Sequence, residues 1–448
     1  MMGAEKILIL GGGESGVGAA LLAKKVGFEP LVSEHGLLKE LYRSELQQAE
    51  ISFEENGHVL AFQQEYNLII VSPGIPDTTA VISHFSDLGS PMISEIEFAW
   101  RYIGSAQLIG ITGSNGKTTV ASLIYHCMSV AGYKAALVGN IGQSFARTVA
   151  SGEYDYYVCE LSSFQLDKVE TLRPHIAVIT NITPDHLDRY DYNFENYIAA
   201  KMRITAHQDS SDLLVINSSD QATVTHLNTE ARTIAVISQP FYSTDYTSHS
   251  GHKYQFNSTQ LIGRHNWLNI AQSIEVLENI GISVEHINRG INSFIPVPHR
   301  MEVVGIVSGV KYINDSKATN VDSTFYALDA MTAPVIWIVG GTDKGNDYAP
   351  LFGLIKEKVR WMIFLGIDNS PLISALRHTN IGFTEVRSMQ DAVKTAEEKA
   401  TAGDVVLLSP ACASFDLFKN YEDRGDQFKL AIGRLDSAQK RAGLISLI

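Results

Sequence analysis

Short apolar runs alternate with amphipathic stretches along the whole of this 448-residue chain. Such alternation is typical of strand–helix–strand units, and it predicts mostly parallel sheets with helices on their faces. Many of the predicted strands end in glycine or a polar residue, at the edge where open α/β sheets bind ligands. The clearest strands are KILIL, NLIIVS, QLIGIT, KAALVG, YYVCE, IAVITNI, DLLVIN, VIWIVGG, WMIFLG and DVVLLSP. We therefore expect an α/β protein.

Two proline-containing segments predict where one domain ends and the next begins. In Gly89–Phe98, serine and proline precede a predicted helix and then a new strand. In Phe294–Glu302, two prolines block a helix and favour an extended linker. A chain of this length is expected to form about two to four domains. We predict three, at residues 1–93, 94–297 and 298–448.

Charge and composition exclude several classes of partner. A formal net charge of −14 argues against a broad surface for nucleic acid or membrane, which would need clustered lysine and arginine. The sequence has neither a signal peptide nor an apolar run of the ~18 residues that span a bilayer. Its three separated cysteines, Cys127, Cys159 and Cys412, form no disulfide or metal-ligand pattern. We expect a soluble, reduced, cytoplasmic protein.

A first glycine loop, Gly11-x-Gly13-x-x-Gly16, lies between a predicted strand and helix, and Glu34 follows the next strand. This spacing matches dinucleotide-binding folds, in which an acid binds the ribose. Backbone N–H groups at a helix N-terminus would equally suit any nucleotide diphosphate. A tight turn without a ligand is the structural alternative. If the loop binds a nucleotide diphosphate, Ser15, Ser72 and Gly74 are further candidate hydrogen-bond donors to it.

A second glycine loop follows the strand QLIGIT and precedes a helix. It departs from the strict P-loop spacing, because Gly110 lies one position too far from Gly116. Its glycines still allow backbone N–H groups to face phosphate oxygens, Lys117 can lie between the β- and γ-phosphates, and Thr118 can bind Mg²⁺. An exposed lysine at a helix start is disfavoured without a nearby anion. The predicted ATP-binding residues are Gly113, Ser114, Asn115, Gly116, Lys117, Thr118 and Thr119.

This variant loop resembles that of the Mur ligases and the folylpolyglutamate synthetases, which are ATP-dependent amide-forming enzymes. The rest of the Mur ligase pattern runs through nearly the whole chain. The resemblance implies a Rossmann-like N-terminal domain for a UDP-linked substrate and a central P-loop-type ATPase domain with a mostly parallel sheet. It also implies a Rossmann-like C-terminal domain for an amino acid.

Two residues of the central part are expected to act with metal. Glu160 ends the strand in VCELSSFQL, and the resemblance implies that it binds Mg²⁺. An acid at a helix N-terminus is the structural alternative. His186, in NITPDHLDRYD, matches a histidine that positions metal and substrate, although with Asp185 and Asp188 it could form an ordinary capping cluster. His186 is also a candidate base for the incoming amine.

Lys201 occupies an unexpected place in its predicted helix. Phe194, Tyr197, Ile198, Lys201 and Met202 fall at helix offsets 0, 3, 4, 7 and 8, so the lysine faces the core. A buried ammonium is costly, and snorkelling of its long stem is the simple explanation. The resemblance implies instead a lysine carbamylated by CO₂, which helps bind a second Mg²⁺.

The remaining assignments follow from the resemblance. Asn140 contacts the sugar-bearing substrate, Asn269 the adenine and Asp315 the ribose. Arg300 holds ATP phosphate, unless it forms a salt bridge in the linker. In the predicted C-terminal domain, the loop VGGTDKGNDY carries two further charged residues, Asp343 and Lys344.

The segment LLSPACASFDLFKNYEDRGDQF predicts a compact anion pocket between a strand and a helix. Within the Mur ligases it is typical of the members that add D-glutamate to UDP-N-acetylmuramoyl-L-alanine. By that resemblance Lys317, Thr319, Ser414 and the ring of Tyr421 hold the D-glutamate, although phenylalanine is more usual at the last position. Glu34 is assigned to the uracil.

These parts imply a reaction through an acyl phosphate, carried out by a monomer. Three rivals stay open: another Mur-type or folylpolyglutamate-type amide ligase, an NAD-dependent oxidoreductase, and a nucleotide-gated binding protein. The oxidoreductase interpretation rests on the first glycine loop and leaves the second one unexplained.

Overall fold

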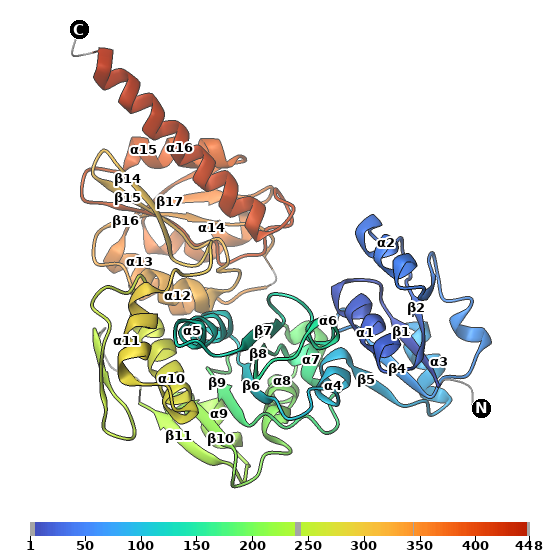
Figure 1. The fold of residues 1–448 in the computed structure, drawn as a ribbon. Coiled ribbons are helices and arrows are strands. Elements are labelled where there is room, and N and C mark those ends of the chain that lie inside the picture. The colour runs from blue at the N-terminus through green and yellow to red at the C-terminus, as the bar shows by residue number, and fades with distance from the viewer. Residues whose placement is uncertain (1–4, 238–242, 344, 446–448) are drawn as a thin grey trace. The chain divides into compact units, whose positions relative to one another are not determined.

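The computed structural model describes residues 5–237, 243–343 and 345–445, which form two compact units (Figure 1). The first unit contains the described residues up to 237 together with Thr244–Asn257 and Leu268–Phe294. The second contains Ser243, Ser258–Trp267 and the described residues from Ile295 onward. In the described part of the chain, no helix is both long and apolar enough to cross a membrane.

A five-stranded parallel sheet opens the first unit (blue in Figure 1), with the strand order β3-β2-β1-β4-β5. This is the order of a doubly wound nucleotide-binding half, in which the first strand is central. Its strands are β1 Lys6–Leu10, β2 Glu29–Ser33, β3 Ser52–Glu54, β4 Leu68–Val71 and β5 Met92–Ser94. The accompanying helices are α1 Glu14–Lys25, α2 Glu40–Gln48, η1 Ala61–Gln63, α3 Ala80–Asp87 and α4 Glu95–Trp100.

A six-stranded parallel sheet follows in the same unit, with the order β11-β10-β9-β6-β8-β7. Strands β9 and β10 are buried at every residue, as expected for strands covered on both faces. The strands are β6 Gln107–Thr112, β7 Ala135–Gly139, β8 Tyr156–Glu160, β9 Ile176–Ile179, β10 Leu213–Asn217 and β11 Arg232–Val236. A short antiparallel pair joins β12 Asp245–Thr247 to β13 Lys253–Gln255.

The helices of this central part begin with α5, which follows the second glycine loop. They are α5 Lys117–Val130, α6 Phe145–Ser151, α7 Ser163–Leu166, η2 Leu187–Tyr190, α8 Phe194–Met202, η3 Arg203–Thr205, α9 Gln221–His226, α10 Arg264–Ile280 and α11 Val284–Ser293. The apolar core of the first unit runs through both sheets, from Ile7 and Ile9 to Leu214 and Ile216.

The second unit has a six-stranded sheet in the order β14-β15-β19-β16-β17-β18, in which only the β14–β15 pair is antiparallel. The strands are β14 Glu302–Val307, β15 Val310–Asn314, β16 Val335–Val339, β17 Val359–Leu365, β18 Gly382–Val386 and β19 Val405–Leu408. The helices are α12 Val321–Asp329, η4 Ala349–Leu351, α13 Phe352–Lys358, α14 Ser370–Leu376, η5 Arg377–Thr379, α15 Met389–Lys399 and α16 Tyr421–Ile445.

The α/β class is confirmed, and each of the ten strands named from the sequence is present. The extended linker is also found, since no helix or strand lies between the end of α11 at Ser293 and the start of β14 at Glu302. The division into three domains stays a prediction. The first two sheets share one compact unit.

Candidate functional site

The second glycine loop lies at the carboxyl end of β6, and its backbone requires glycine. Gly113 has a φ of 142° and Gly116 a φ of 86°. A Cβ atom on Gly113 would lie 2.0 Å from the hydroxyl of Thr180, and one on Gly116 would lie 2.5 Å from the amide oxygen of Asn269. The loop therefore curls tightly against its neighbours, and it brings Asn269 next to the turn that starts α5.

Hydrogen bonds to the segment after β9 hold this loop in place. The N–H of Asn115 donates to the side chain of Asn181 at 3.0 Å. The hydroxyl of Ser114 donates to the carbonyl of Thr183 at 2.8 Å and accepts the N–H of Thr183 at 2.9 Å. Thr118 and Thr119, in the first turn of α5, are buried. These contacts fasten the loop to the segment after β9.

Lys117 begins helix α5 and reaches back over the loop. Its Nζ donates to the carbonyl oxygens of Gly113 at 2.7 Å and Ser114 at 2.8 Å. The ammonium thus lies above the curled backbone, where a phosphate would be held by loop N–H groups. Such a phosphate would replace neutral carbonyls with a charged partner, and charge-assisted hydrogen bonds are stronger than neutral ones.

Lys201, in α8, is only 1% exposed, and its Nζ donates to the carbonyl of Gly113 at 2.7 Å. The snorkelling explanation is therefore wrong for this residue, because the ammonium is buried together with its stem. Burial, followed by the positive charge of Lys117, lowers the pKa of Lys201 well below its usual value. The neutral amine is the nucleophilic form of lysine, and a lowered pKa favours it, so the environment suits reaction with CO₂.

Glu160 ends β8 and is 1% exposed. One carboxylate oxygen accepts a hydrogen bond from the side-chain amide of Asn140 at 2.8 Å, whereas the buried Oε2 has no hydrogen-bond partner among the described residues. The alternative of an acid in a helix first turn is wrong, because α7 begins only at Ser163. A buried carboxylate oxygen without a donor fits a hard cation such as Mg²⁺.

His186 adopts a left-handed backbone conformation with a φ of 51°, just before η2. Its N–H donates to the carboxylate of Asp185 at 2.9 Å, but among the described residues no side-chain hydrogen bond caps η2, whose N-cap is His186 itself. The ring is nevertheless 47% exposed and meets Phe164 edge-on at 5.2 Å between centroids. Among the described residues, no three acidic, histidine or cysteine side chains lie together as a metal cluster. A Mg²⁺ ion held by Glu160 would therefore need further ligands, such as hydroxyl, phosphate or carbamate oxygens.

The first glycine loop joins β1 to α1. Gly11 has a φ of 96°, and a Cβ atom on Gly16 would lie 1.8 Å from the carbonyl oxygen of Gly11. Glu34 accepts the N–H of Gly12 at 2.7 Å through one oxygen and the N–H of Gly36 at 2.9 Å through the other. Glu34 thus fastens the loop to the end of β2, a role that the sequence did not suggest. The other predicted contacts of this loop are Ser15 in the first turn of α1, and Ser72 and Gly74 after β4.

In the second unit, Asp315 follows β15 and is 5% exposed. It accepts hydrogen bonds from the hydroxyl of Ser409 at 2.9 Å and from the N–H of Met301 at 3.2 Å. Burial raises the pKa of Asp315 to about 7, while the Ser409 hydrogen bond and the charge of Arg300 oppose the rise. The Nε of Arg300 is itself buried and has no hydrogen-bond partner among the described residues. The charge of Arg300 thus acts on the Asp315 carboxyl, and its buried Nε fits a polar ligand.

The predicted amino-acid pocket also lies in this unit. The Nζ of Lys317 is 5.3 Å from the centre of the Tyr421 ring, and Ser414 is buried. The N–H of Thr319 donates to the carbonyl of Lys317 at 2.9 Å, which folds the loop back on itself. Asp343 caps its own loop by accepting the N–H groups of Gly345 and Asn346. Lys344 lies outside the described residues.

Arg424 is a buried residue between these loops that sequence reasoning missed. It lies in α16, is 1% exposed, and donates to the hydroxyl and the carbonyl of Ser316 at 3.0 and 2.8 Å. It also donates to the carbonyl of Cys412 at 3.2 Å. Its guanidinium thereby joins the loop after β15 to the loop after β19. The signal was available, because Tyr421, Arg424 and the fully buried Phe428 share one helical face.

Two family models match the chain. "Mur ligase middle domain" matches residues 111–277, and "Mur ligase, glutamate ligase domain" matches residues 299–412. The second glycine loop, which bears Lys117, and Glu160 therefore lie within the first match, and Asp315 lies within the second.

Curated relatives match over nearly their full length. The UDP-N-acetylmuramoylalanine--D-glutamate ligase of Cytophaga hutchinsonii is 45% identical, over 95% of this chain and 98% of the relative. The protein of the same name from Bacteroides thetaiotaomicron is 44% identical, over 96% of this chain and 100% of the relative. Among solved structures, MurF ligase from Thermotoga maritima in complex with ADP has a TM-score of 0.61 at 13% identity, and it covers 92% of this chain and 96% of that chain. The models and the relatives together show that the chain belongs to the Mur ligase family.

Proposed function

We propose that the chain is an ATP-dependent ligase that adds D-glutamate to UDP-N-acetylmuramoyl-L-alanine during peptidoglycan precursor synthesis. Near-full-length relatives carry the name of this activity. The observation that carries the proposal is the loop at 113–117, where two glycine-dependent turns and two lysine side chains meet at the carboxyl edge of a parallel sheet. Such a loop suits the terminal phosphates of ATP.

The proposed reaction has two steps. The L-alanine carboxylate attacks the γ-phosphorus of ATP, so that a carboxylate oxygen forms a bond to phosphorus while the bond to the ADP oxygen breaks. The amine of D-glutamate then attacks the acyl carbon, and phosphate leaves with that oxygen. Lys117 and Arg300 stabilise the charge that accumulates on the transferred phosphoryl group. The ammonium of D-glutamate must also lose a proton, for which His186 is a candidate acceptor.

Magnesium belongs to this proposal, with two sites expected. The partnerless oxygen of Glu160 fits a cation, and the proposed ligands are Thr118, Glu160, His186 and a CO₂-derived carbamate on Lys201. When bound, Mg²⁺ supplies positive charge that offsets the charge of the phosphates. A carbamate would also turn the buried amine of Lys201 into an anion that needs a cation beside it.

The substrates are divided among three proposed domains. Residues 1–93, a Rossmann-like domain, bind the UDP end through Ser15, Glu34, Ser72 and Gly74, with Asn140 contacting the sugar. Residues 94–297, a P-loop-type ATPase domain, bind the ATP phosphates and adenine, the latter through Asn269. Residues 298–448, also Rossmann-like, bind the ribose through Asp315 and D-glutamate through Lys317, Thr319, Ser414 and Tyr421. We propose a monomer that works in the cytoplasm.

Phosphate release with different amino acids tests this function. The purified chain is given ATP, Mg²⁺ and UDP-N-acetylmuramoyl-L-alanine, with D-glutamate, L-glutamate or L-alanine. The proposal predicts phosphate release with D-glutamate and little with the other two. Release with another amino acid alone would favour a different amide ligase. Hydride transfer to NAD without phosphate release would favour the oxidoreductase, and ATP hydrolysis that needs neither substrate would favour a nucleotide-gated binding protein.

A further inference from the structure

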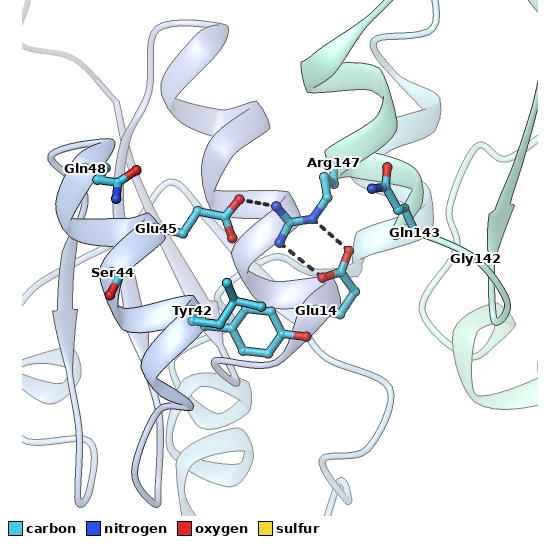
Figure 2. Close-up of a pocket in the computed structure, with 9 residues that line it drawn as sticks. Glu14, Tyr42, Ser44, Glu45, Gln48, Gly142, Gln143 and Arg147 are labelled. Atoms are coloured by element: carbon cyan, nitrogen blue, oxygen red, sulfur yellow. Dashed lines mark hydrogen bonds and ion pairs between the residues drawn. The ribbon is translucent and has the colours of Figure 1, made fainter. Parts of the chain in front are cut away.

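A cavity of about 630 Å³ lies where the first glycine loop of the first unit approaches the segment after β7 (Figure 2). Its lining includes Glu14 from the first turn of α1, Glu45 from α2, Arg147 from α6, and Gly142 and Gln143. In the part of the lining that the structure describes, Arg147 is the only cation. The cavity thus adjoins the two segments to which the proposed function assigns the UDP-linked substrate.

Arg147 forms a two-sided ion pair in this cavity. Its Nε and Nη2 donate to the two carboxylate oxygens of Glu14 at 2.7 and 3.1 Å, and its Nη1 donates to Glu45 (Figure 2). The arginine side chain is 14% exposed, whereas Glu14 and Glu45 are 36% and 30% exposed. A forked guanidinium facing a carboxylate fixes orientation as well as charge.

The backbone packs closely around the same ion pair. Glu14 also accepts the N–H of Ser144 at 3.1 Å, and the hydroxyl of Ser144 accepts the N–H of Arg147 at 3.1 Å as the cap of α6. A Cβ atom on Gly18 would lie 2.0 Å from that hydroxyl and 3.0 Å from the Cβ of Arg147. Helices α1 and α6 therefore touch directly, and a change at one is transmitted to the other.

The negative charge of Glu14 disfavours binding of the pyrophosphate of the proposed UDP-linked substrate. A pyrophosphate bound at the N-terminus of α1 would lie near this carboxylate, and like charges repel over several ångströms. Arg147 offsets that charge and leaves the helix N–H groups available. Without Arg147, both Glu14 and Glu45 would face the cavity without a cationic partner there.

We infer that Arg147 is a positioning residue for the UDP-linked substrate: it neutralises Glu14 and fixes the first glycine loop against the segment at 139–144. The inference rests on the proposed function, because it concerns the site assigned there to UDP-N-acetylmuramoyl-L-alanine. ATP and D-glutamate are assigned to other residues. The effect of losing Arg147 is thus specific to one of the three substrates.

Steady-state kinetics of Arg147→Gln test the inference. The KM for UDP-N-acetylmuramoyl-L-alanine should rise about tenfold, while kcat and the KM values for ATP and D-glutamate change less than about twofold. The rise should shrink as salt is added, because screening weakens repulsion between exposed charges. The double variant Glu14→Gln/Arg147→Gln should have a KM for UDP-N-acetylmuramoyl-L-alanine close to that of the parent, because it also lacks the negative charge of Glu14. Glu40→Gln, on the exposed side of α2, is the matched control and should behave as the parent.

Arg147→Lys covers the case in which Arg147→Gln does not fold. Lysine keeps the positive charge but cannot donate two parallel hydrogen bonds to Glu14 as the guanidinium does. We therefore expect a smaller rise in the KM for UDP-N-acetylmuramoyl-L-alanine and no change in the other two KM values. An unchanged KM in the folded variant, equal rises for all three substrates, or no recovery in the double variant would overturn the inference. If the parent chain itself shows no D-glutamate-dependent activity, the proposed function fails instead.

Discussion

Lys117 and Lys201 donate to the same acceptor, the carbonyl oxygen of Gly113, and each Nζ lies 2.7 Å from it. Two ammonium groups at one neutral oxygen repel each other, and burial makes the charge of Lys201 the more costly of the two. Lys117 lies at the helix start beside the curled loop, where a phosphate would stabilise its charge. For Lys201, loss of a proton from the ammonium removes the cost of burying its charge.

Lys201 is expected to react with CO₂. The reaction needs a neutral amine, and the lowered pKa of Lys201 favours that form. Carbon-13 NMR of the folded protein in labelled bicarbonate should show a carbamate signal that Lys201→Ala lacks. The same variant should lose about 10²-fold or more in kcat, and the exposed Lys134→Ala should not. A fully active Lys201→Ala would refute the assigned role.

Glu160→Gln should weaken the response to Mg²⁺. The substitution keeps an oxygen for the amide of Asn140 but removes the negative charge from the buried oxygen that lacks a donor. We expect the Mg²⁺ concentration that gives half-maximal rate to rise about 10–100-fold, with the fold intact by circular dichroism. An unchanged Mg²⁺ titration would show that the unpartnered oxygen serves another purpose.

The strands and the two glycine loops could be predicted from sequence because their signals are local. Apolar runs mark the buried strands, and the glycine spacing marks turns that tolerate no side chain. The helical offset also predicted that Lys201 faces inward. The helical offset could not show which group the ammonium contacts, because its acceptor, the carbonyl of Gly113, lies 88 residues away in the chain. The strands of three residues, such as β3 and β12, are too short to produce a periodic signal.

Arg147 and Arg424 show the limit of sequence reasoning more clearly. The carboxylate partner of Arg147 lies 133 residues away, and Ser316, the partner of Arg424, lies 108 residues away. The helical face that Arg424 shares with Tyr421 and Phe428 indicates that it points inward, but neither local sequence shows which residues the guanidinium contacts. Likewise, Glu34 matched the position of a ribose-binding acid, but both of its oxygens accept backbone N–H groups of neighbouring turns.

Arg424→Met should damage the proposed amino-acid pocket. The guanidinium holds two loops through Ser316 and Cys412, and its removal leaves buried carbonyl oxygens without donors. We expect a loss of about 2–3 kcal/mol in the free energy of unfolding and a raised KM for D-glutamate. Arg434→Met, at an exposed position of the same helix, is the control. A stable variant with an unchanged KM would contradict the clamping role.

Glu95 should make stability fall as the pH rises. It is 2% exposed and accepts the N–H of Ala146 at 2.5 Å, and burial raises its pKa from 4.5 to about 7. The folded state therefore binds its proton more tightly than the unfolded state does. The resulting stability is complete below about pH 4.5 and is lost as the pH rises through about 7.

Glu95→Gln should reverse this loss, because the amide stays neutral. At pH 8 the variant should be more stable than the parent by about 1–3 kcal/mol in urea unfolding, and the difference should shrink towards pH 5. The exposed Glu153→Gln should match the parent at both pH values. A difference that does not depend on pH would mean that packing, not titration, controls this position.

The fate of one oxygen atom tests the central claim, that the loop bearing Lys117 directs the γ-phosphoryl group of ATP to a carboxylate. UDP-N-acetylmuramoyl-L-alanine labelled with ¹⁸O in its terminal carboxylate is turned over with ATP, Mg²⁺ and D-glutamate, and the released phosphate is analysed by mass spectrometry. The account predicts one ¹⁸O atom in each phosphate, and no release by Lys117→Ala. Unlabelled phosphate, released alongside product, would contradict it.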